Sequence, residues 1–446
     1  MTTSLHPIVN PVVKKYQEEF SSRGHKLPGA EHGWVASMRN EALSALTRNG
    51  LPTRHVESWK YTDLRSLYRA KFANKKSVDV SDAVARFMIK DTHTVVFVDG
   101  NFVPMLSEIE LFPEGLEVFS LADALNSGDE VLLEGLGEVV DFEQPGFAAV
   151  NTALMQGGGV CRIGENVSAD KPIHFIFLTT DSASAELHLR NLVVAGANSK
   201  ATVMQSFVSL GESSGFCNVV NELVLREGAE ISNILYQDQS EMAWYIGLTG
   251  ASLERNAHFD SFVLSSGAKL SRNEIRLNLD GEGANCSING IALVRGRQHC
   301  DNTTDVDHKK SRCHSRQSYK NVLDGYAHTV FQGRVHVAPY AQQTDAQQMN
   351  RNLLLSRNAQ ADSKPELIIH ADDVKCGHGA TVGDLDQEAL FYLQSRGINP
   401  DAARNMMVHA FASELVETLP EGKIRLYLEQ AITSWLETLE SVKKAA

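Results

Sequence analysis

The chain has 446 residues, of which 43% are hydrophobic and 22% are charged, a composition typical of a globular protein. A chain of this length is expected to form two or three domains. Its formal net charge of -13 argues against sequence-independent binding of nucleic acid, which needs a basic surface. No segment approaches the roughly 18 apolar residues that a membrane helix needs, so no membrane association is expected.

The six cysteines are scattered along the chain, with no C-x-x-C pair and no dense framework. Cysteines spaced in this way are expected to be free thiols in a reducing compartment. The opening residues, MTTSLHPIVNPVVKKYQEEF, lack the apolar core and the small-residue cleavage site of a secretion signal. The sequence therefore predicts a cytoplasmic protein.

Residues 1–165 are expected to form an N-terminal domain of helices mixed with a few strands. Apolar residues recur at helical spacing in GWVASMRNEALSALTRNG and again in HVESWKYTDLRSLYRA, so a helix is predicted at each. The stretch HTVVFVDGNFVP predicts a hairpin around Asp99 and Gly100. The stretch FAAVNTALMQGGG predicts a helix that glycines end.

Residues 166–380 are expected to form a β-rich core. Short strands with alternating apolar residues follow one another, among them IHFIFLTT, ATVMQSFVSL and NVVNELVLR, and no helical stretch of a dozen residues intervenes. The pair Gly-Ala recurs at positions 196, 228, 250, 267 and 283. This recurrence suits the turns of a β-solenoid, in which coils stack about 4.8 Å apart. A β-sandwich also has many short strands and is the alternative fold.

Residues 381–446 are expected to form a C-terminal helical domain that caps the core. Asp386 is placed to cap a helix over QEALFYLQSRG that ends at Gly397, and Asn399 and Pro400 begin the next helix. Each of the last two helices carries an apolar stripe. The stripes are Ala403, Met407, Phe411 and Leu415, and then Ile424, Leu428, Ile432, Trp435 and Leu439.

Two motifs typical of other functions occur without the context that they need. GESSG at 211–215 matches G-x-S-x-G with Ser213 as the nucleophile, but a strand is predicted after it where a nucleophile elbow needs a helix. DNTTDVDH at 301–308 lacks the glycine and the glutamate of a calcium loop and is expected to be a solvated loop. The sequence has no P-loop, so an ATP-dependent step would need an ATPase on another chain.

Cys376 and His378 are the residues whose chemistry best suits a metal. They lie two positions apart in IIHADDVKCGHGATVGDLD, on a predicted turn that follows a short strand at 367–369. Thiolate and imidazole are good ligands for iron, zinc and copper(I), but two donors cannot close a tetrahedral site alone. Either further ligands come from elsewhere, or the site is open, or it is shared between chains. An ordinary turn whose Cys and His happen to be neighbours is the alternative.

Three segments resemble the SufB/SufD scaffold family of the SUF iron–sulfur cluster assembly system, and within it the SufD type. They are GLPTRHVESWKYTDLRSL at 50–67, SRQSYKNVLDGYAHTVFQGRVHVAPYAQQTDAQQMNRNLLLS at 315–356 and SKPELIIHADDVKCGHGATVGDLDQEALFYLQSRGI at 363–398. The SufB type usually carries a cysteine-rich N-terminal segment, which is not found here. The resemblance implies a right-handed parallel β-helix core, flanked by an N-terminal and a C-terminal domain, in a scaffold that is not an enzyme.

The same resemblance implies partners and a site. The chain is expected to pair with a SufB-like paralogue through the C-terminal ends of the two β-helices, to bind a SufC-like ATPase, and to form a homodimer when alone. A transient iron–sulfur cluster is expected at the interface with the paralogue, near His378 and Cys376, and no tightly bound cofactor in the isolated chain. The residues expected to bind the ATPase are Phe391, Tyr392, Arg396, Met407 and Phe411.

Two other classes of function remain as alternatives. A carbohydrate-active β-helix enzyme would need acidic or basic residues clustered along one face of the solenoid. A purely structural protein that binds SufC-like partners, without a role in cluster chemistry, would not need Cys376 and His378.

Overall fold

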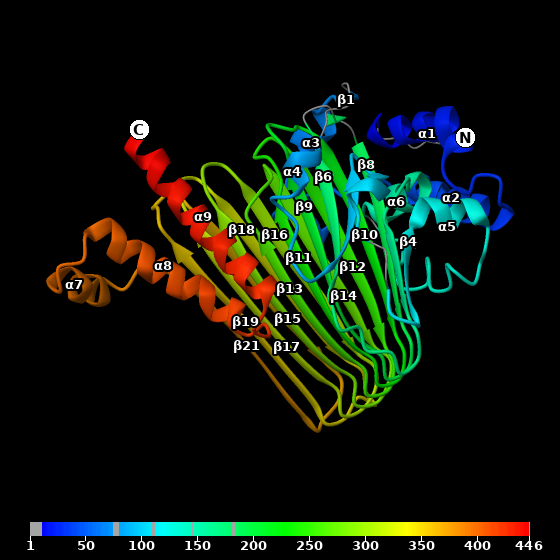
Figure 1. Ribbon diagram of the computed structural model, residues 1–446. Helices are drawn as coiled ribbons and strands as arrows, with labels where there is room; N and C mark the ends of the chain where they lie inside the picture. The colour runs from blue at the N-terminus through cyan, green and yellow to red at the C-terminus, as the bar shows by residue number, and fades with distance from the viewer. Residues whose placement is uncertain are drawn as a thin grey trace, which may run out of the picture.

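The centre of the molecule is a β-solenoid made of two sheets that face each other, so the β-sandwich alternative is wrong (Figure 1). The computed structural model describes residues 11–74, 80–108, 112–144, 146–180, 183–184 and 186–445. The N-terminal helices gather at the first coils, α8 (Pro400–Val416) lies against β15 (Asn285–Val294) and β17 (His314–Leu323), and α9 (Lys423–Ala445) crosses the face of the same sheet (Figure 1). The prediction of a mainly β fold with flanking helices is confirmed.

The helices fall into an N-terminal and a C-terminal group. They are α1 (Pro11–Arg23), α2 (Gly33–Asn49), α3 (Arg65–Arg69), α4 (Ser81–Val84), α5 (Leu121–Ser127) and α6 (Ala148–Leu154), then α7 (Gln387–Ser395), α8 (Pro400–Val416) and α9 (Lys423–Ala445). None of the helices in the described ranges is long and apolar enough to cross a membrane.

The strands form two large sheets, here called sheet I and sheet II. Sheet I has the order β20 (Gln360–Ile369), β18 (His328–Val337), β16 (His299–His308), β14 (Leu270–Leu279), β12 (Trp244–Leu253), β10 (Phe216–Leu225), β8 (Glu186–Ala195), β5 (Gly159–Ile163) and β4 (Leu116–Ser120). Sheet II has the order β21 (Val374–Gly383), β19 (Thr344–Leu354), β17 (His314–Leu323), β15 (Asn285–Val294), β13 (His258–Ser265), β11 (Glu230–Asp238), β9 (Lys200–Ser209), β6 (Ile173–Thr179), β2 (His93–Val98) and β3 (Asn101–Phe102). The two-residue strands β1 (Ala73–Asn74) and β7 (Ala183–Ser184) pair separately.

From β8 onward, successive strands alternate between the two sheets and pair in parallel with the strand two positions later. His299 on β16, for example, pairs with His328 on β18, 29 residues further along the chain. Each coil turns a corner through a residue in the left-handed conformation, such as Asn198 (φ 54°) and Gly228 (φ 68°). Glycine and asparagine tolerate this conformation, which explains why they recur in the sequence. Gly250, by contrast, lies within β12 and marks no corner.

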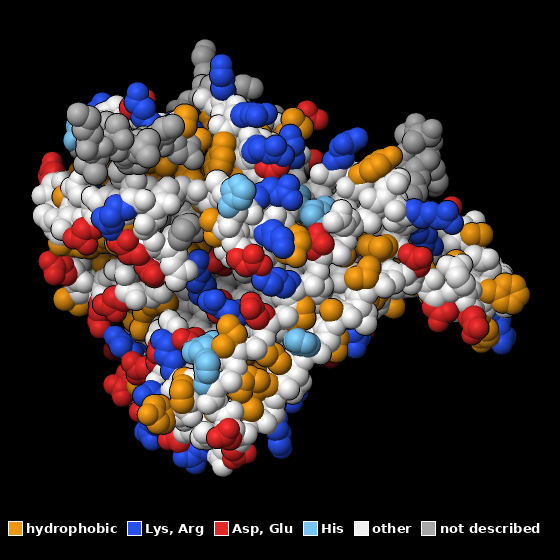
Figure 2. Space-filling view, turned by 180° about the vertical axis from the view of Figure 1, so that it is seen from behind, with side chains coloured by type: hydrophobic (Ala, Val, Ile, Leu, Met, Phe, Trp, Pro, Cys, Tyr) orange, Lys and Arg blue, Asp and Glu red, His pale blue; other side chains and the backbone are white. Residues whose placement is uncertain are grey.

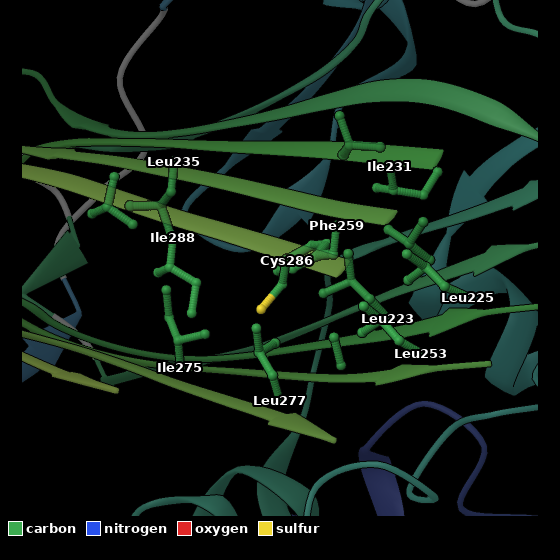
Figure 3. Packing of buried hydrophobic residues seen from close by; sticks show 14 of the residues in the cluster. Leu223, Leu225, Ile231, Leu235, Leu253, Phe259, Ile275, Leu277, Cys286 and Ile288 are labelled. Carbon is green, nitrogen blue, oxygen red and sulfur yellow. The ribbon is translucent and has the colours of Figure 1, made fainter. Parts of the chain in front are cut away.

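Apolar side chains fill the space between the sheets, because every second residue of each strand points inward. Figure 3 shows these side chains meeting from the two sheets in the middle coils. Sheet I contributes Leu223, Leu225, Leu253, Ile275 and Leu277, and sheet II contributes Ile231, Leu235, Phe259, Cys286 and Ile288. All six cysteines are free thiols, as predicted, and five of them are buried.

The predicted C-terminal helices are present, and they cover the side of the solenoid and not its end. Leu415 of α8 and Leu428, Ile432 and Trp435 of α9 pack against outward-facing residues of sheet II such as Met204. Figure 1 shows α9 lying across this face. The caps and stripes of these helices are otherwise as expected, although the side chain of Leu439 lies outside the described residues. In the described chain, β20 and β21 are therefore the outermost strands at the end of the solenoid.

The N-terminal residues pack on the outer face of sheet I, where Trp59 and Phe147 contact Phe216 and Trp244 in one cluster. The predicted hairpin at β2 and β3 and the helix α6 are confirmed. The predicted helix over HVESWKYTDLRSLYRA is wrong, because only 57–59 and α3 are helical. Strands β2, β4 and β5, which precede residue 166, extend the two sheets, and the division at 165 and 380 stays a prediction.

Two further local predictions are wrong. DNTTDVDH at 301–308 is not a solvated loop but part of β16, where its acidic side chains pair with neighbouring cations. The strand predicted at 367–369 begins already at Gln360 and includes Pro365, which is tolerated because β20 is an edge strand. In both places polar residues that suggest a loop lie on the outer surface of a ladder.

A fully buried ion pair ties the segment before α6 to sheet I. Arg190 on β8 and Glu222 on β10 are both 0% exposed and contact each other through Arg190 Nε and Glu222 Oε1 at 2.8 Å. The same carboxylate accepts hydrogen bonds from the backbone N–H groups of Gly137, Val139 and Val140. A single buried charge therefore holds this loop against the solenoid.

Replacing Glu222 with alanine should lower the free energy of unfolding by about 3–5 kcal/mol, because Arg190 would be left buried without a counter-ion. Glu254→Ala is the matched control, since Glu254 forms a half-exposed pair with Arg226 at 2.9 Å and should change stability by less than about 1 kcal/mol. Urea titration monitored by circular dichroism measures both. Equal effects of the two substitutions would contradict this role of the buried pair.

Candidate functional site at the end of the solenoid

Cys376 and His378 lie on β21, the outermost strand of sheet II, and not on a turn as predicted. Their Cα partners on the preceding strand β19 are Ala346 and Gln348. The glycines around them suggested a turn, yet they continue the ladder. The pair therefore sits on a rigid edge where no further coil follows in the described chain.

The two side chains project from the same face of β21, because they are two residues apart in a strand. This is the inward face, since Val374 and Cys376 pack against the interior cluster of the solenoid. Cys376 is half-buried, whereas His378, nearer the middle of the strand, is exposed. The two groups thus border the mouth of the solenoid, where the space between the sheets opens.

Partial burial raises the pKa of the Cys376 thiol, and the nearby carboxylate of Asp345 raises it further, against the opposing hydrogen bond of the Ala346 backbone. A thiol with a raised pKa stays protonated at neutral pH and becomes a strong ligand only when a metal displaces its proton. Cys376 is consequently a poor nucleophile in the isolated chain.

The glycines beside the pair make room for side chains of the preceding coil. A Cβ atom on Gly377 would lie 2.9 Å from Gln347 Oε1, and one on Gly379 would lie 2.9 Å from Met349 Cε. The outward-facing side chains of β19 therefore explain why glycine occupies these two positions of β21.

Cys376 and His378 supply two ligand atoms, which is fewer than a closed site needs. Among the described residues, no group of three or more His, Cys, Asp or Glu side chains is placed to hold a metal ion. The arrangement leaves the pair exposed along an open edge, with room for donors from another molecule.

The five residues expected to bind the ATPase divide into two sets. On α7, Phe391 is 73% exposed and Tyr392 is 58% exposed, and the guanidinium of Arg396 lies 5.2 Å from the centre of the Tyr392 ring. Figure 2 shows hydrophobic side chains on the lobe that α7 forms, which projects from the body of the molecule. An exposed aromatic pair beside an arginine has the composition of a protein interface.

The other two residues belong to the junction between α8 and sheet II. Met407 and Phe411 are half-buried, and the Phe411 ring lies 4.7 Å from Lys320 Nζ. Lys320 on β17 is 1% exposed and donates a hydrogen bond to the backbone oxygen of Phe411 at 2.8 Å. Burial lowers the pKa of Lys320, although Glu414 opposes this change. Sequence reasoning missed Lys320, because its role depends on a helix 91 residues away.

The residues that suggested enzymatic motifs have structural roles. Asp305 pairs with Arg334, and Asp307 lies 2.8 Å from His336 Nδ1, so these acids do not converge on a cleft. Ser213 lies in the connection between β9 and β10, and β10 takes the place of the helix that a nucleophile elbow needs. Neither observation favours a hydrolase or a lyase.

The fold is a two-sheet β-solenoid with an open final coil and helices along its sides. Residues 11–175 match the model of the SufBD protein N-terminal region, and residues 177–411 match that of the SufBD core domain of the SUF system for FeS cluster assembly. The chain therefore belongs to the SufBD family of the SUF iron–sulfur cluster assembly system.

Curated relatives span nearly the whole chain. The iron–sulfur cluster assembly protein SufD of Escherichia coli is 33% identical over 90% of this chain and 93% of its own length. An iron–sulfur cluster assembly SufBD family protein of Synechocystis is 32% identical over 91% of this chain and 92% of its own length. SufD of Bacillus subtilis is 24% identical over 94% of this chain and 97% of its own length. The predicted membership of the family, with its likeness to SufD, is confirmed.

Alkylation of Cys376 should be slower at neutral pH than that of a small peptide thiol, and its rate should rise about tenfold per pH unit towards the raised pKa. Mass spectrometry after iodoacetamide treatment measures the rate, and the buried Cys161 serves as an internal control that should not react in the folded protein. Alkylation of Cys376 faster than the peptide thiol at neutral pH would contradict the raised pKa.

Proposed function

We propose that this chain is a non-catalytic scaffold subunit of a SufBCD-type complex, in which it pairs with a SufB-like paralogue and a SufC-like ATPase. The pairing uses the open end of the solenoid formed by β20 and β21. A nascent iron–sulfur cluster, which is cargo of the complex, is held there between this chain and the paralogue. Alone, the chain forms a homodimer through the same edge, and it works in the cytoplasm.

The observation that carries this proposal is the position of Cys376 and His378 on an unpaired edge strand. An open strand edge favours pairing with another chain, because its backbone groups have no partner. The two side chains that suit iron lie on that edge and border the mouth of the solenoid. A shared site explains both the unpaired edge and the incomplete set of ligands.

His378 is proposed as the ligand from this chain, with Cys376 beside it as an auxiliary ligand. Histidine is a common ligand of iron and is exposed here, whereas the Cys376 thiol is half-buried and has a raised pKa. No tightly bound cofactor is proposed for the isolated chain, because the remaining ligands would come from the paralogue.

The ATPase is proposed to bind at α7 through Phe391, Tyr392 and Arg396. Met406, which is 52% exposed on α8, is a further apolar residue in this region that the sequence did not single out. Met407 and Phe411 would act indirectly by fixing α8 to sheet II. The alternative of a carbohydrate-active enzyme is not favoured, because the acids of β16 are engaged in ion pairs on the outer face.

His378→Ala should abolish or sharply reduce cluster maturation in cells that depend on this system, while folding and complex assembly stay intact because the side chain is exposed. Cys376→Ala should have a smaller effect. Growth under iron limitation with each variant as the sole copy measures maturation. His370→Ala is the control, since His370 is an exposed histidine just before β21 that contacts His336. Full maturation with His378→Ala in a normally assembled complex would refute the shared site.

Replacing Phe391 and Tyr392 together with serine should weaken ATPase binding by at least about tenfold, because exposed aromatic residues carry a large part of interface energy. The dissociation constant for the purified SufC-like ATPase measures this effect. Met105→Ser is the control, since Met105 is 92% exposed in the N-terminal part of the chain. Unchanged affinity of the double variant would exclude α7 as the docking site.

A further inference from the structure

A row of four hydrogen bonds joins the N-terminal residues to three neighbouring strands of sheet I. Thr62 Oγ1 contacts the carboxylate of Asp301 on β16 and lies 3.0 Å from His299 Nε2 on the same strand. His299 Nδ1 lies 3.1 Å from His328 Nδ1 on β18. His328 Nε2 lies 2.6 Å from Asp362 Oδ2 on β20. The row therefore ends on the outermost strand of the sheet.

These four hydrogen bonds need four hydrogen atoms. The hydroxyl of Thr62 supplies one, and each neutral imidazole supplies one, so the three groups in the middle supply three in total. The two carboxylates at the ends supply none when they are ionised. One additional proton is required for every bond in the row to form.

The direction of the bonds places that proton. Asp301 also accepts a hydrogen bond from Arg272, which is 0% exposed, so it is an ionised acceptor and Thr62 donates to it. His299 must then donate to Thr62 through Nε2 and accept through Nδ1. His328 therefore donates through both ring nitrogens, which only an imidazolium can do. Burial lowers the pKa of His299 to about 4, although Asp301 opposes this change, so His299 is not the carrier of the charge.

The carboxylate of Asp362, which lies against His328, favours a cation at this place. The charged groups that act on the histidine pair lie on its own strands and on the neighbouring strands β14 and β20. They are Arg272 on β14, Asp301 on β16 and Asp362 on β20. Glu274, Arg276, Arg334 and Lys364 lie four to six residues further along their strands, and Glu57 pairs with Lys364 there. In the described chain Glu274, Asp301 and Glu57 each pair with an arginine or a lysine, whereas the ion pair of Asp362 is with His328.

We propose that His328 is held as an imidazolium between Asp362 and His299, and that this single proton latches the N-terminal segment Glu57–Thr62 to the last coils of the solenoid. Loss of the proton breaks the row and leaves Asp362 without a cation. Because the bound proton stabilises the latched form, the latch loosens when that proton is lost at higher pH.

The latch is placed to influence the outermost coil. It reaches β20, and it is reinforced by the ion pair between Lys364 and Glu57 at 2.7 Å and by the hydrogen bond from Gln332 Nε2 to the Ser58 oxygen at 3.1 Å. The Trp59 ring packs over the Arg272 guanidinium at 4.0 Å, which adds an apolar cover to the buried end of the row. A proton bound at His328 thus helps to order β20, the edge strand of sheet I.

The protonation state is tested by NMR of the full chain labelled with 15N-histidine. We expect both ring nitrogens of His328 to show imidazolium shifts at neutral pH, with couplings to two attached hydrogens. In Asp362→Asn these signals should be lost at neutral pH. Neutral-imidazole shifts for His328 in the wild-type chain would overturn the proposal, and they would place the extra proton on Asp362 or show that the row is broken.

The mechanical role is tested by hydrogen–deuterium exchange of the amides of Trp59, Lys60 and Thr62, which donate hydrogen bonds to the backbone oxygens of Val56, Glu57 and Trp59. After correction for intrinsic exchange, Asp362→Asn should make them exchange roughly tenfold faster, the change expected for one lost charge-assisted hydrogen bond. Asp307→Asn is the matched control. It removes the carboxylate partner of His336, which lies on β18 as His328 does, and it leaves the four hydrogen bonds of the row unchanged. Equal exchange in both variants, or protection that does not fall with rising pH in the wild type, would overturn the latch.

Discussion

A parallel β-solenoid satisfies its backbone hydrogen bonds only by stacking one coil on the next, so its last coil leaves an open edge. In this protein β20 and β21 are those edges. The N-terminal segment covers the outer face of sheet I, and α8 and α9 cover the outer face of sheet II. The free backbone N–H and C=O groups of the edge strands are therefore at this end of the solenoid, and Cys376 and His378 lie at the same end.

Buried polar groups fix the flanking segments to the solenoid. Glu222 accepts hydrogen bonds from three backbone N–H groups of the loop before α6, and Lys320 donates one to the backbone oxygen of Phe411 on α8. A buried charged group is costly unless all its hydrogen bonds are made. Each of these two side chains therefore favours the one position of the flanking segment in which its hydrogen bonds form. Together they keep the helices on the sides of the solenoid and away from the mouth between the sheets.

Strand alternation and recurring corner residues favour a solenoid, because both follow from the backbone geometry of stacked coils, but they leave a β-sandwich open. The resemblance to the SufB/SufD family supplies the choice of a parallel β-helix. The position of Cys376 and His378 on an edge strand could not be predicted. The glycines around them suggest a turn, but in the structure they make space for Gln347 and Met349 of the previous coil. The strand at DNTTDVDH is not predictable for a related reason, because two of its acids pair with arginines one coil away. Contacts between coils join residues about 30 positions apart, and no local pattern reports them.

The central claim is that the open end of the solenoid holds a cluster jointly with a paralogue and that His378 is a ligand. It is tested most directly by electron–nuclear double resonance on the assembled complex, with a reduced cluster and 15N-histidine incorporated only into this chain. The account predicts a 15N coupling of directly bonded strength that disappears in His378→Ala. A cluster bound in the assembled complex without any such coupling from this chain would contradict it.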